Sequence, residues 1–270
     1  MRIIKSQKIR AAVSALCVKA NLFLQPDILA LLKAAQKKEK SKRAQEILAS
    51  IIKNAAYARQ NKLAICQDTG MPIVFLQIGQ DVRIAGSLAA AVNQGVADGY
   101  RQASLRNSII QDPLARGKSG FTPAVIHTEI IAGNKIKITV LPKGFGCENK
   151  TQLKMFKPTA GIAEIKKFIL DAVKSAGPDA CPPYVVGVGI GGTADYACLL
   201  AKKALLGKTS TKLEADLLKE INKLNIGPMG LGGKTTALAV KVKTYPTHIA
   251  GLPVCVNISC HATRSASRVI

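Results

Sequence analysis

The sequence predicts an α/β fold in which a mixed sheet is flanked by helices and the N-terminal third is helical. Apolar residues recur at three- and four-residue spacing over about the first 60 residues, which is typical of amphipathic helices. Beyond residue 70, short apolar runs between Gly, Pro and Asn predict strands that alternate with helices. No repeat or clean linker interrupts the chain, so one mixed domain over residues 1–270 is the simplest organisation.

Three helices are predicted in the N-terminal third. The first carries an apolar face formed by Ile9, Val13, Leu16, Cys17 and Ala20. Pro26 and Asp27 open the second, with Asp27 as its N-cap. Ser41 caps the third, whose apolar stripe is Ala44, Ile47, Leu48, Ile51, Ile52 and Ala55.

The middle of the chain changes to strand patterns. Residues 73–78 form a short apolar run, which predicts a strand. The segments 124–131 and 135–141 flank Ala132-Gly133-Asn134 and predict a hairpin. Residues 102–123 are rich in turn formers and predict a long loop, and long loops in compact domains are often functional.

The C-terminal half alternates between helix and strand patterns. The predicted elements are, in order, a helix from Thr159, a buried strand at 184–190, helices at 194–206 and 209–224, and strands at 237–242 and 253–259.

Composition and charge exclude several classes of protein. The 39 Lys and Arg against 16 Asp and Glu give a net charge of +23, which suits nucleic acid, an anionic partner or an anionic small substrate. Aromatic residues are only 4 % and Trp is absent, so the stacking platforms of nucleic-acid binders are missing. No apolar run approaches the ~20 residues that span a bilayer. Seven cysteines without a secretory signal predict reduced thiols and a cytoplasmic location.

Two glycine-rich motifs imitate nucleotide sites. Gly187–Gly192 matches the dinucleotide fingerprint, but the following segment predicts a helix where that fold requires a strand ending in an acid. Residues 228–235 miss the phosphate-loop pattern at Pro228 and precede a strand instead of a helix. Both are better explained as turns that let the backbone approach a small anion.

The cysteines lack the close spacing of a zinc ribbon or a ferredoxin. Three lie inside predicted elements and are expected to pack there: Cys17, Cys198 and Cys255. Three others lie at the ends of elements: Cys66, Cys181 and Cys260. Three such thiolates can hold a cubane cluster and leave one iron open as a Lewis acid, although free cysteines at strand ends are also common. Position alone leaves Cys147, in a turn, as a further candidate.

Six motifs together resemble class I, iron–sulfur fumarate hydratases. They are LAICQDTG at 63–70, KGFGCENKT at 143–151, ACPPY at 180–184, IGGT at 190–193, GLGGK at 230–234 and VNISC at 256–260. The match runs from about Val13 to the end and is strongest with the alpha subunit of the two-subunit fumarases. The alpha subunit of L(+)-tartrate dehydratase shares the pattern.

The resemblance implies a set of site residues. In that family three cysteines hold a 4Fe–4S cluster with one iron free for substrate, and they fall on Cys66, Cys181 and Cys260, which rejects Cys147. It also implies that Gln67 and Asp68 contact substrate, that Arg106 binds a substrate carboxylate and that Gly146 lines the site. Asp68 would handle a proton at the reacting oxygen.

The resemblance also implies a partner and a reaction. The chain stops soon after Cys260, so we expect a beta subunit to supply the second domain of the single-chain enzymes, in a hetero-oligomer such as α2β2. The turn 143–151 departs from the glycine-rich version of single-chain relatives. The expected activity is a hydro-lyase that interconverts fumarate and (S)-malate, with L-tartrate dehydration as the alternative. A nucleotide- or nucleic-acid-binding protein without a cluster is the third hypothesis.

Overall fold

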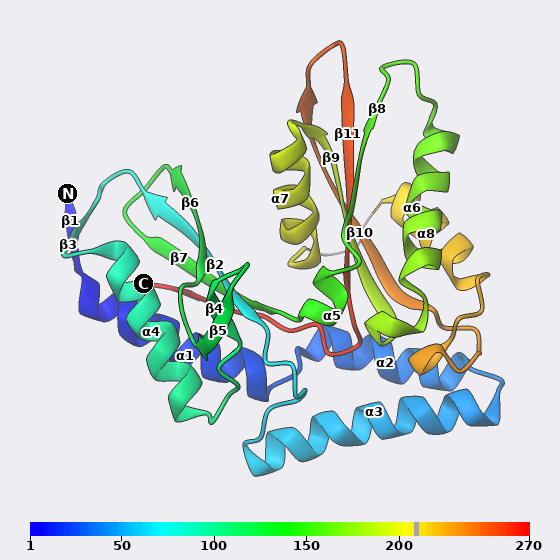
Figure 1. Cartoon of the computed structure of the whole chain (residues 1–270), viewed down its shortest axis with the longest axis horizontal. Helices are drawn as coiled ribbons and strands as arrows, with labels where there is room; N and C mark the ends of the chain where they lie inside the picture. The colour runs from blue at the N-terminus through cyan, green and yellow to red at the C-terminus, as the bar shows by residue number, and fades with distance from the viewer. Residues whose placement is uncertain (208–210) are drawn as a thin grey trace. The chain divides into compact units, whose positions relative to one another are not determined.

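The structure is a computed structural model that describes residues 1–207 and 211–270. It confirms a mixed α/β chain with a helical N-terminal third. The chain divides into two compact units: unit 1 is Met1–Gln25, Asn54–Phe145 and Arg264–Ile270, and unit 2 is Pro26–Lys53 and Gly146–Thr263. Each unit has its own four-stranded sheet (Figure 1).

The sheet of unit 1 corrects the predicted hairpin. Its order is β12 (Ala266–Val269), β7 (Ile136–Lys143), β2 (Met71–Gly79) and β6 (Val125–Ile131). The strand β2 lies between the two presumed hairpin partners, parallel to β6 and antiparallel to β7. The reason is burial, because β2 is apolar and buried along most of its length and therefore takes a central position.

Two helices pack together in unit 1, α1 (Ser6–Leu22) and α4 (Leu88–Gln102). Their approach depends on two glycines of α4, because a Cβ at Gly95 would lie 2.5 Å from the Arg10 carbonyl oxygen and one at Gly99 2.6 Å from that of Ser14. The stretch Ser6–Lys38 is long and apolar enough to cross a membrane by length and composition alone. In the structure the apolar face of α1 is buried in the core of unit 1.

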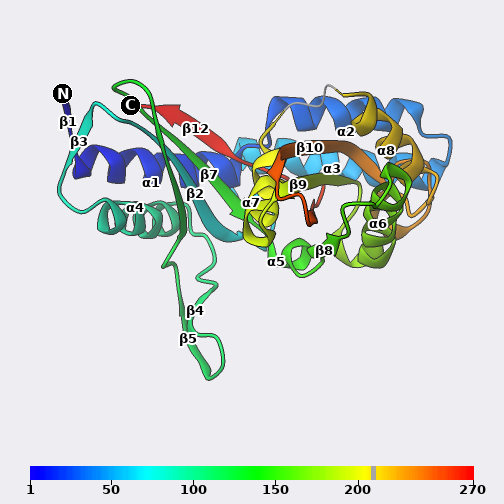
Figure 2. The same ribbon diagram turned by 90° about the horizontal axis from the view of Figure 1, so that it is seen from above.

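The predicted loop at 102–123 contains a hairpin that its sequence pattern does not reveal. The strands β4 (Ile109–Asp112) and β5 (Arg116–Gly120) pair antiparallel and project from unit 1 (Figure 2). The turn forms because the Asp112 carboxylate accepts hydrogen bonds from the backbone N–H groups of Leu114 and Ala115. Elsewhere in unit 1, β1 (Arg2–Lys5) pairs parallel with β3 (Val82–Ala85).

The sheet of unit 2 confirms the three C-terminal strands and adds a fourth. Its order is β10 (Ala237–Thr247), β9 (Tyr184–Gly192), β11 (Leu252–Ser259) and β8 (Gln152–Phe156). Helices α6 (Ile162–Ala176) and α8 (Lys212–Asn222) cover one face, and α7 (Ala194–Leu205) covers the other (Figure 1). The helix predicted from Thr159 begins later, because Pro158 leads a turn closed by the Ala160 N–H and the Lys157 carbonyl.

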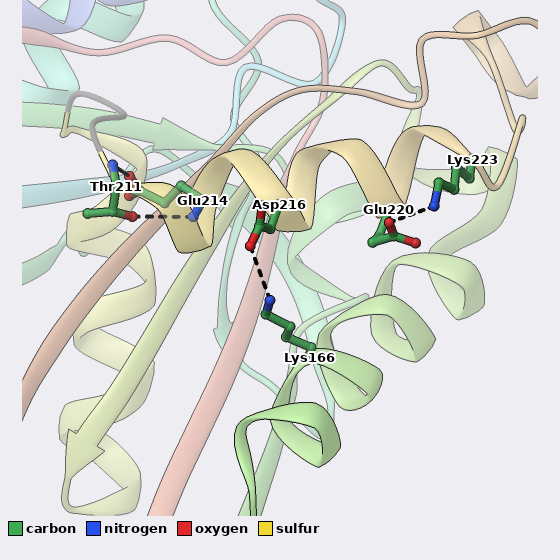
Figure 3. A network of polar contacts seen from close by, with 6 residues as sticks. All are labelled: Lys166, Thr211, Glu214, Asp216, Glu220 and Lys223. Carbon is green, nitrogen blue, oxygen red and sulfur yellow. Dashed lines mark hydrogen bonds and ion pairs between the residues drawn. The ribbon is translucent and has the colours of Figure 1, made fainter.

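Helix α8 begins with a capping box. The Thr211 hydroxyl accepts a hydrogen bond from the Glu214 N–H at 3.2 Å, and the Glu214 carboxylate accepts one from the Thr211 N–H at 2.8 Å. Figure 3 shows the cap and an ion pair between Asp216 and Lys166 of α6. The predicted start at Thr209 lies outside the described residues.

The remaining helices are α2 (Pro26–Lys38), α3 (Lys42–Asn61), α5 (Phe145–Glu148) and the 3₁₀ turns η1 (Gly177–Ala180) and η2 (Pro228–Gly230). Ser41 caps α3 as predicted, because its hydroxyl accepts from the Ala44 N–H. Asp27 is not the N-cap of α2. The helix already begins at Pro26, which places Asp27 inside the first turn.

Both glycine-rich motifs have structural explanations, and the first corrects the prediction of a turn, because Gly187–Gly192 lies in strand β9. A Cβ at Gly187 of β9 would lie 2.2 Å from a carbonyl oxygen of α7, and one at Gly189 would lie 2.0 Å from another. These glycines therefore allow α7 to pack closely against the sheet. In the second motif, the Lys234 N–H donates to the buried carboxylate of Glu39 at 2.8 Å. The anion against this glycine-rich turn is therefore a carboxylate of the chain itself.

Candidate functional site

The turn that carries Cys66 joins α3 to β2 in unit 1. Ile65, the residue before Cys66, is fixed by two hydrogen bonds. Its N–H donates to the Asn21 carbonyl, and its carbonyl accepts from the Asn54 side chain. The half-buried Cys66 thiol donates to the side-chain oxygen of Gln67 at 3.4 Å. An accessible thiol on a rigid backbone suits a metal ligand.

The Asp68 carboxylate is held by two backbone N–H groups. One oxygen accepts from Gly70 at 3.0 Å, and the other accepts from Phe145 at 2.8 Å. Asp68 is half-buried, and a Cβ at Gly144 would lie 3.1 Å from its carboxylate. Each carboxylate oxygen has a second lone pair, so the group can still accept a bond from a bound molecule.

Arg106 is brought to this turn by Thr69. The Arg106 N–H donates to the Thr69 hydroxyl at 3.1 Å, and that hydroxyl lies 3.4 Å from the Arg106 carbonyl oxygen. The Arg106 side chain is exposed. Unit 1 therefore assembles Cys66, Gln67, Asp68 and Arg106, all predicted from the sequence, on one pair of connected loops.

Two residues that support these loops were not predicted. Arg264 is buried, and its guanidinium donates to the Asp68 carbonyl and to the Asn21 side-chain oxygen. The Tyr100 hydroxyl lies within hydrogen-bond distance of the Thr69 and Gly70 carbonyls. No local pattern marks Arg264, whereas Thr69 belongs to the CQDTG motif and could have been noted there.

Cys181 and Cys260 are brought together within unit 2. Cys181 follows η1 in a left-handed conformation, with φ +53°. Its carbonyl oxygen accepts from the N–H of His261, which follows Cys260, and lies 3.1 Å from the His261 ring Nδ1. A carbonyl only accepts hydrogen bonds, so a hydrogen bond at this contact requires the tautomer with its proton on Nδ1. Both thiols are half-buried, as ligands open to a substrate need to be.

Tyr184 packs among the thiols of unit 2. Burial raises the pKa of its hydroxyl, and the nearby thiols of Cys147, Cys181 and Cys260 raise it further. The hydroxyl donates to the Gly177 carbonyl. The Tyr184 side chain therefore stays protonated and uncharged beside these cysteines.

The other cysteines lie in packing positions. Cys17 and Cys255 are buried, Cys198 is half-buried, and burial raises the pKa of Cys17 to about 12. Burial also raises the pKa of Cys255, and the neighbouring Cys198 thiol raises it further. Cys147 is buried as well, with its thiol bonded to the Ala180 carbonyl at 3.4 Å. Buried thiols with a raised pKa, as at Cys17 and Cys255, are poor metal ligands.

Gly146 is exposed in unit 2, and a Cβ there would meet only the Asp179 carbonyl oxygen, at 4.0 Å. Within the part of each unit that the structure describes, no three His, Cys, Asp or Glu side chains lie together as a metal site. Cysteine thiolates are the usual ligands of iron–sulfur clusters. Cys66 lies in a loop of unit 1, whereas Cys181 and Cys260 lie in unit 2.

Comparison with known proteins gives one consistent picture. A family described as fumarate hydratase (Fumerase) matches residues 10–269. A Methanocaldococcus jannaschii protein, provisionally named L(+)-tartrate dehydratase subunit alpha, is 40% identical over 97% of this chain and 98% of its own length. The L(+)-tartrate dehydratase subunit alpha of Escherichia coli O157:H7 is 27% identical, over 90% of this chain and 84% of its own. The same subunit of strain K12 is 28% identical over the same shares.

Proposed function

The chain belongs to the fumarate hydratase family, and from that premise we propose that it is the alpha subunit of an iron–sulfur hydro-lyase that interconverts fumarate and (S)-malate. The observation that carries the proposal is the contact between His261 and the Cys181 carbonyl, because it joins the two thiol-bearing segments of unit 2. The loops of unit 1 support it with a third accessible thiol, a carboxylate and an arginine.

Cys66, Cys181 and Cys260 would hold the cluster. When bound, a 4Fe–4S cluster with one open iron supplies Lewis-acid polarisation of the substrate C–O bond. Cysteines bind iron as thiolates, and all three side chains are half-buried and not fully enclosed.

Arg106 would bind one carboxylate of the substrate. A guanidinium can bind a carboxylate in a bidentate manner, which fixes orientation as well as charge. The backbone of Arg106 is fixed by its hydrogen bond to Thr69. Less conformational entropy is therefore lost when a substrate binds to this loop. The exposed Gln67 side chain, next to Cys66, would add a neutral hydrogen bond to the same ligand.

Asp68 would hold or move a proton at the reacting oxygen of the substrate. Its carboxylate is oriented by the N–H groups of Gly70 and Phe145, so its remaining lone pairs have fixed directions. A hydroxyl of the substrate could donate to one of them. The proton on the adjacent carbon would be removed by a group of a second subunit.

A beta subunit is the partner that this proposal needs. The relatives reported above are named as alpha subunits, which supports a second kind of subunit in the assembly. An α2β2 complex is the simplest arrangement. The net charge of +23 would also favour encounter with a dianionic substrate.

The first test is iron and sulfide content on the chain purified without oxygen, alone and with a beta subunit. About four irons with matching sulfide and a broad brown absorbance are expected. Replacing Cys66, Cys181 or Cys260 by Ala should remove the iron, and Cys17→Ala is the matched control that should not. A complex that stays colourless after anoxic reconstitution would overturn the proposal. Salt-dependent binding of nucleotide or nucleic acid by that colourless protein would then favour the third hypothesis.

L-tartrate is the second candidate substrate, and the names of the relatives favour it. Malate and tartrate both present a hydroxyl and two carboxylates, so the groups named above suit either. Turnover of both substrates by the assembled complex decides between them. A higher kcat/KM for tartrate would replace the fumarate assignment and leave the cluster chemistry standing.

A further inference from the structure

The segment Gly146–Thr151 touches the segment that carries Cys181. The buried Cys147 thiol donates to the carbonyl of Ala180, the residue before Cys181, at 3.4 Å. The Lys150 ammonium lies 2.9 Å from the Asp179 carboxylate on the same turn. One side of Gly146–Thr151 is therefore attached to η1, directly before the thiol.

The same segment also touches the strand that carries Cys260. The side-chain nitrogen of Asn257, three residues before Cys260, donates to the Glu148 carboxylate at 2.8 Å and to the Thr151 hydroxyl at 2.8 Å. That hydroxyl donates in turn to the Glu148 carbonyl at 2.7 Å. The other Glu148 oxygen forms an ion pair with Lys202 of α7. The direction of each bond is settled, because the carboxylate and the carbonyl can only accept.

Asn257 is fully buried, and its side-chain oxygen has no hydrogen-bond partner among the described residues. A buried polar atom without a partner costs about 1–3 kcal/mol. An apolar side chain of similar size would avoid that cost. Packing alone therefore does not explain an amide at this position. Its two donated hydrogen bonds, to Glu148 and to Thr151, do explain it.

We propose that Gly146–Thr151 is a bracket that sets the separation of Cys181 and Cys260, with Cys147 and Asn257 as its positioning residues. This inference rests on the proposed function, in which both cysteines are cluster ligands. It assigns Cys147 a role that is not ligation. Hydrogen bonds behind the ligands orient them and slow the loss of a bound metal.

The test compares variants of the full chain after anoxic reconstitution with its beta subunit. In Asn257→Leu the two donated bonds are lost, and we expect iron to be lost to a chelator about 10-fold faster. Asn257→Asp should also lose iron faster, because a carboxylate cannot donate to the Glu148 carboxylate and is repelled by it. The pair Asn257→Asp with Glu148→Gln reverses the donor and acceptor and should restore most of the iron retention. Thr211→Ala, which removes the cap of α8 in the same unit, is the matched control.

A second readout needs no cluster. In the iron-free chain, alkylation by iodoacetamide is followed at each cysteine by peptide mass spectrometry. Asn257→Leu and Cys147→Ala should change the rates at Cys181 and Cys260 and leave the rate at Cys66 unchanged. A wild-type complex that binds no iron would defeat the proposed function, while altered rates at Cys181 and Cys260 would still support the bracket. Unchanged rates at both thiols, with unchanged iron retention, would overturn the bracket.

Discussion

The hydroxyl of Thr69 contacts both backbone polar groups of Arg106, at 3.1 Å from the nitrogen and 3.4 Å from the oxygen. These residues are 37 positions apart in the chain. The contact ties the loop of the proposed carboxylate-binding arginine to the loop of Cys66 and Asp68. Thr69 is 3% exposed, so it acts through Arg106 and not on a ligand directly.

Removing that hydroxyl should weaken substrate binding more than turnover. In Thr69→Val the shape is kept and the hydrogen bonds are lost, so Arg106 is no longer held in place. We expect KM to rise about 10-fold, which corresponds to about 1.4 kcal/mol, with a smaller change in kcat. Steady-state kinetics of the complex checks this. Thr69→Ser keeps the hydroxyl and should restore KM, and an equal fall in kcat without a change in KM would contradict the assignment.

Arg264 should be a strong determinant of stability. Its truncation to Leu leaves the Asp68 carbonyl and the Asn21 side-chain oxygen without this donor. Each buried acceptor left unpaired costs about 1–3 kcal/mol, so losing the donor to two of them should lower the free energy of unfolding by about 2–6 kcal/mol. Urea denaturation measures the fall. Arg268→Leu, at an exposed position of β12, is the matched control and should stay within about 0.5 kcal/mol of wild type. Equal stability of the two variants would refute the role of Arg264.

Gly189→Ala tests why the dinucleotide-like motif exists. The new Cβ would lie 2.0 Å from the Ala197 carbonyl oxygen of α7, so the helix must move from the sheet. Overpacking of this kind costs about 1–3 kcal/mol or more. Gly161→Ala is the control, because nothing lies within 4 Å of its Cβ and its φ is −77°. Thermal unfolding distinguishes them, and equal melting temperatures would show that α7 is not held by this close contact.

Stability should fall at alkaline pH partly through Cys17. Burial raises the pKa of its thiol to about 12 in the folded chain, against about 8.5 for an unfolded thiol. Above about pH 8.5 the unfolded state releases a proton that the folded state retains. The stabilising contribution of the protonated Cys17 thiol is therefore fully present below about pH 8.5 and is lost as the pH rises toward 12.

Urea denaturation between pH 8 and 10 measures this dependence. Each thiol shifted in this way contributes a slope of about 1.4 kcal/mol per pH unit. The free energy of unfolding of Cys17→Ala should therefore fall less steeply with pH than that of wild type. It should still fall, because Cys255 and the buried Tyr100 also have raised pKa values. Parallel curves for wild type and Cys17→Ala would show that Cys17 does not titrate in this way.

Local features of the chain were predictable because their causes are local. The apolar spacing of α1, the Ser41 cap of α3 and the position of β9 all depend on residues within one or two turns or along one strand. The same holds for Cys181 and Cys260, which directly follow η1 and β11, whereas Cys66 lies within the loop between α3 and β2 and not at the end of an element. Two of the failures were also local, because the turn at Pro158 delays the start of α6 and the Asp112 turn forms a hairpin, and apolar periodicity records neither.

Patterns along the chain predicted the fold class, most of the elements, the family and the residues named for the proposed site. The folded structure was needed to show that β2 separates β6 from β7, that Arg264 supports Asp68 from 196 residues away, and that the Glu39 carboxylate lies against the glycine-rich turn. These features are hydrogen bonds and packing contacts between distant segments. Their energies depend on strand order and burial, which no spacing along a single segment encodes.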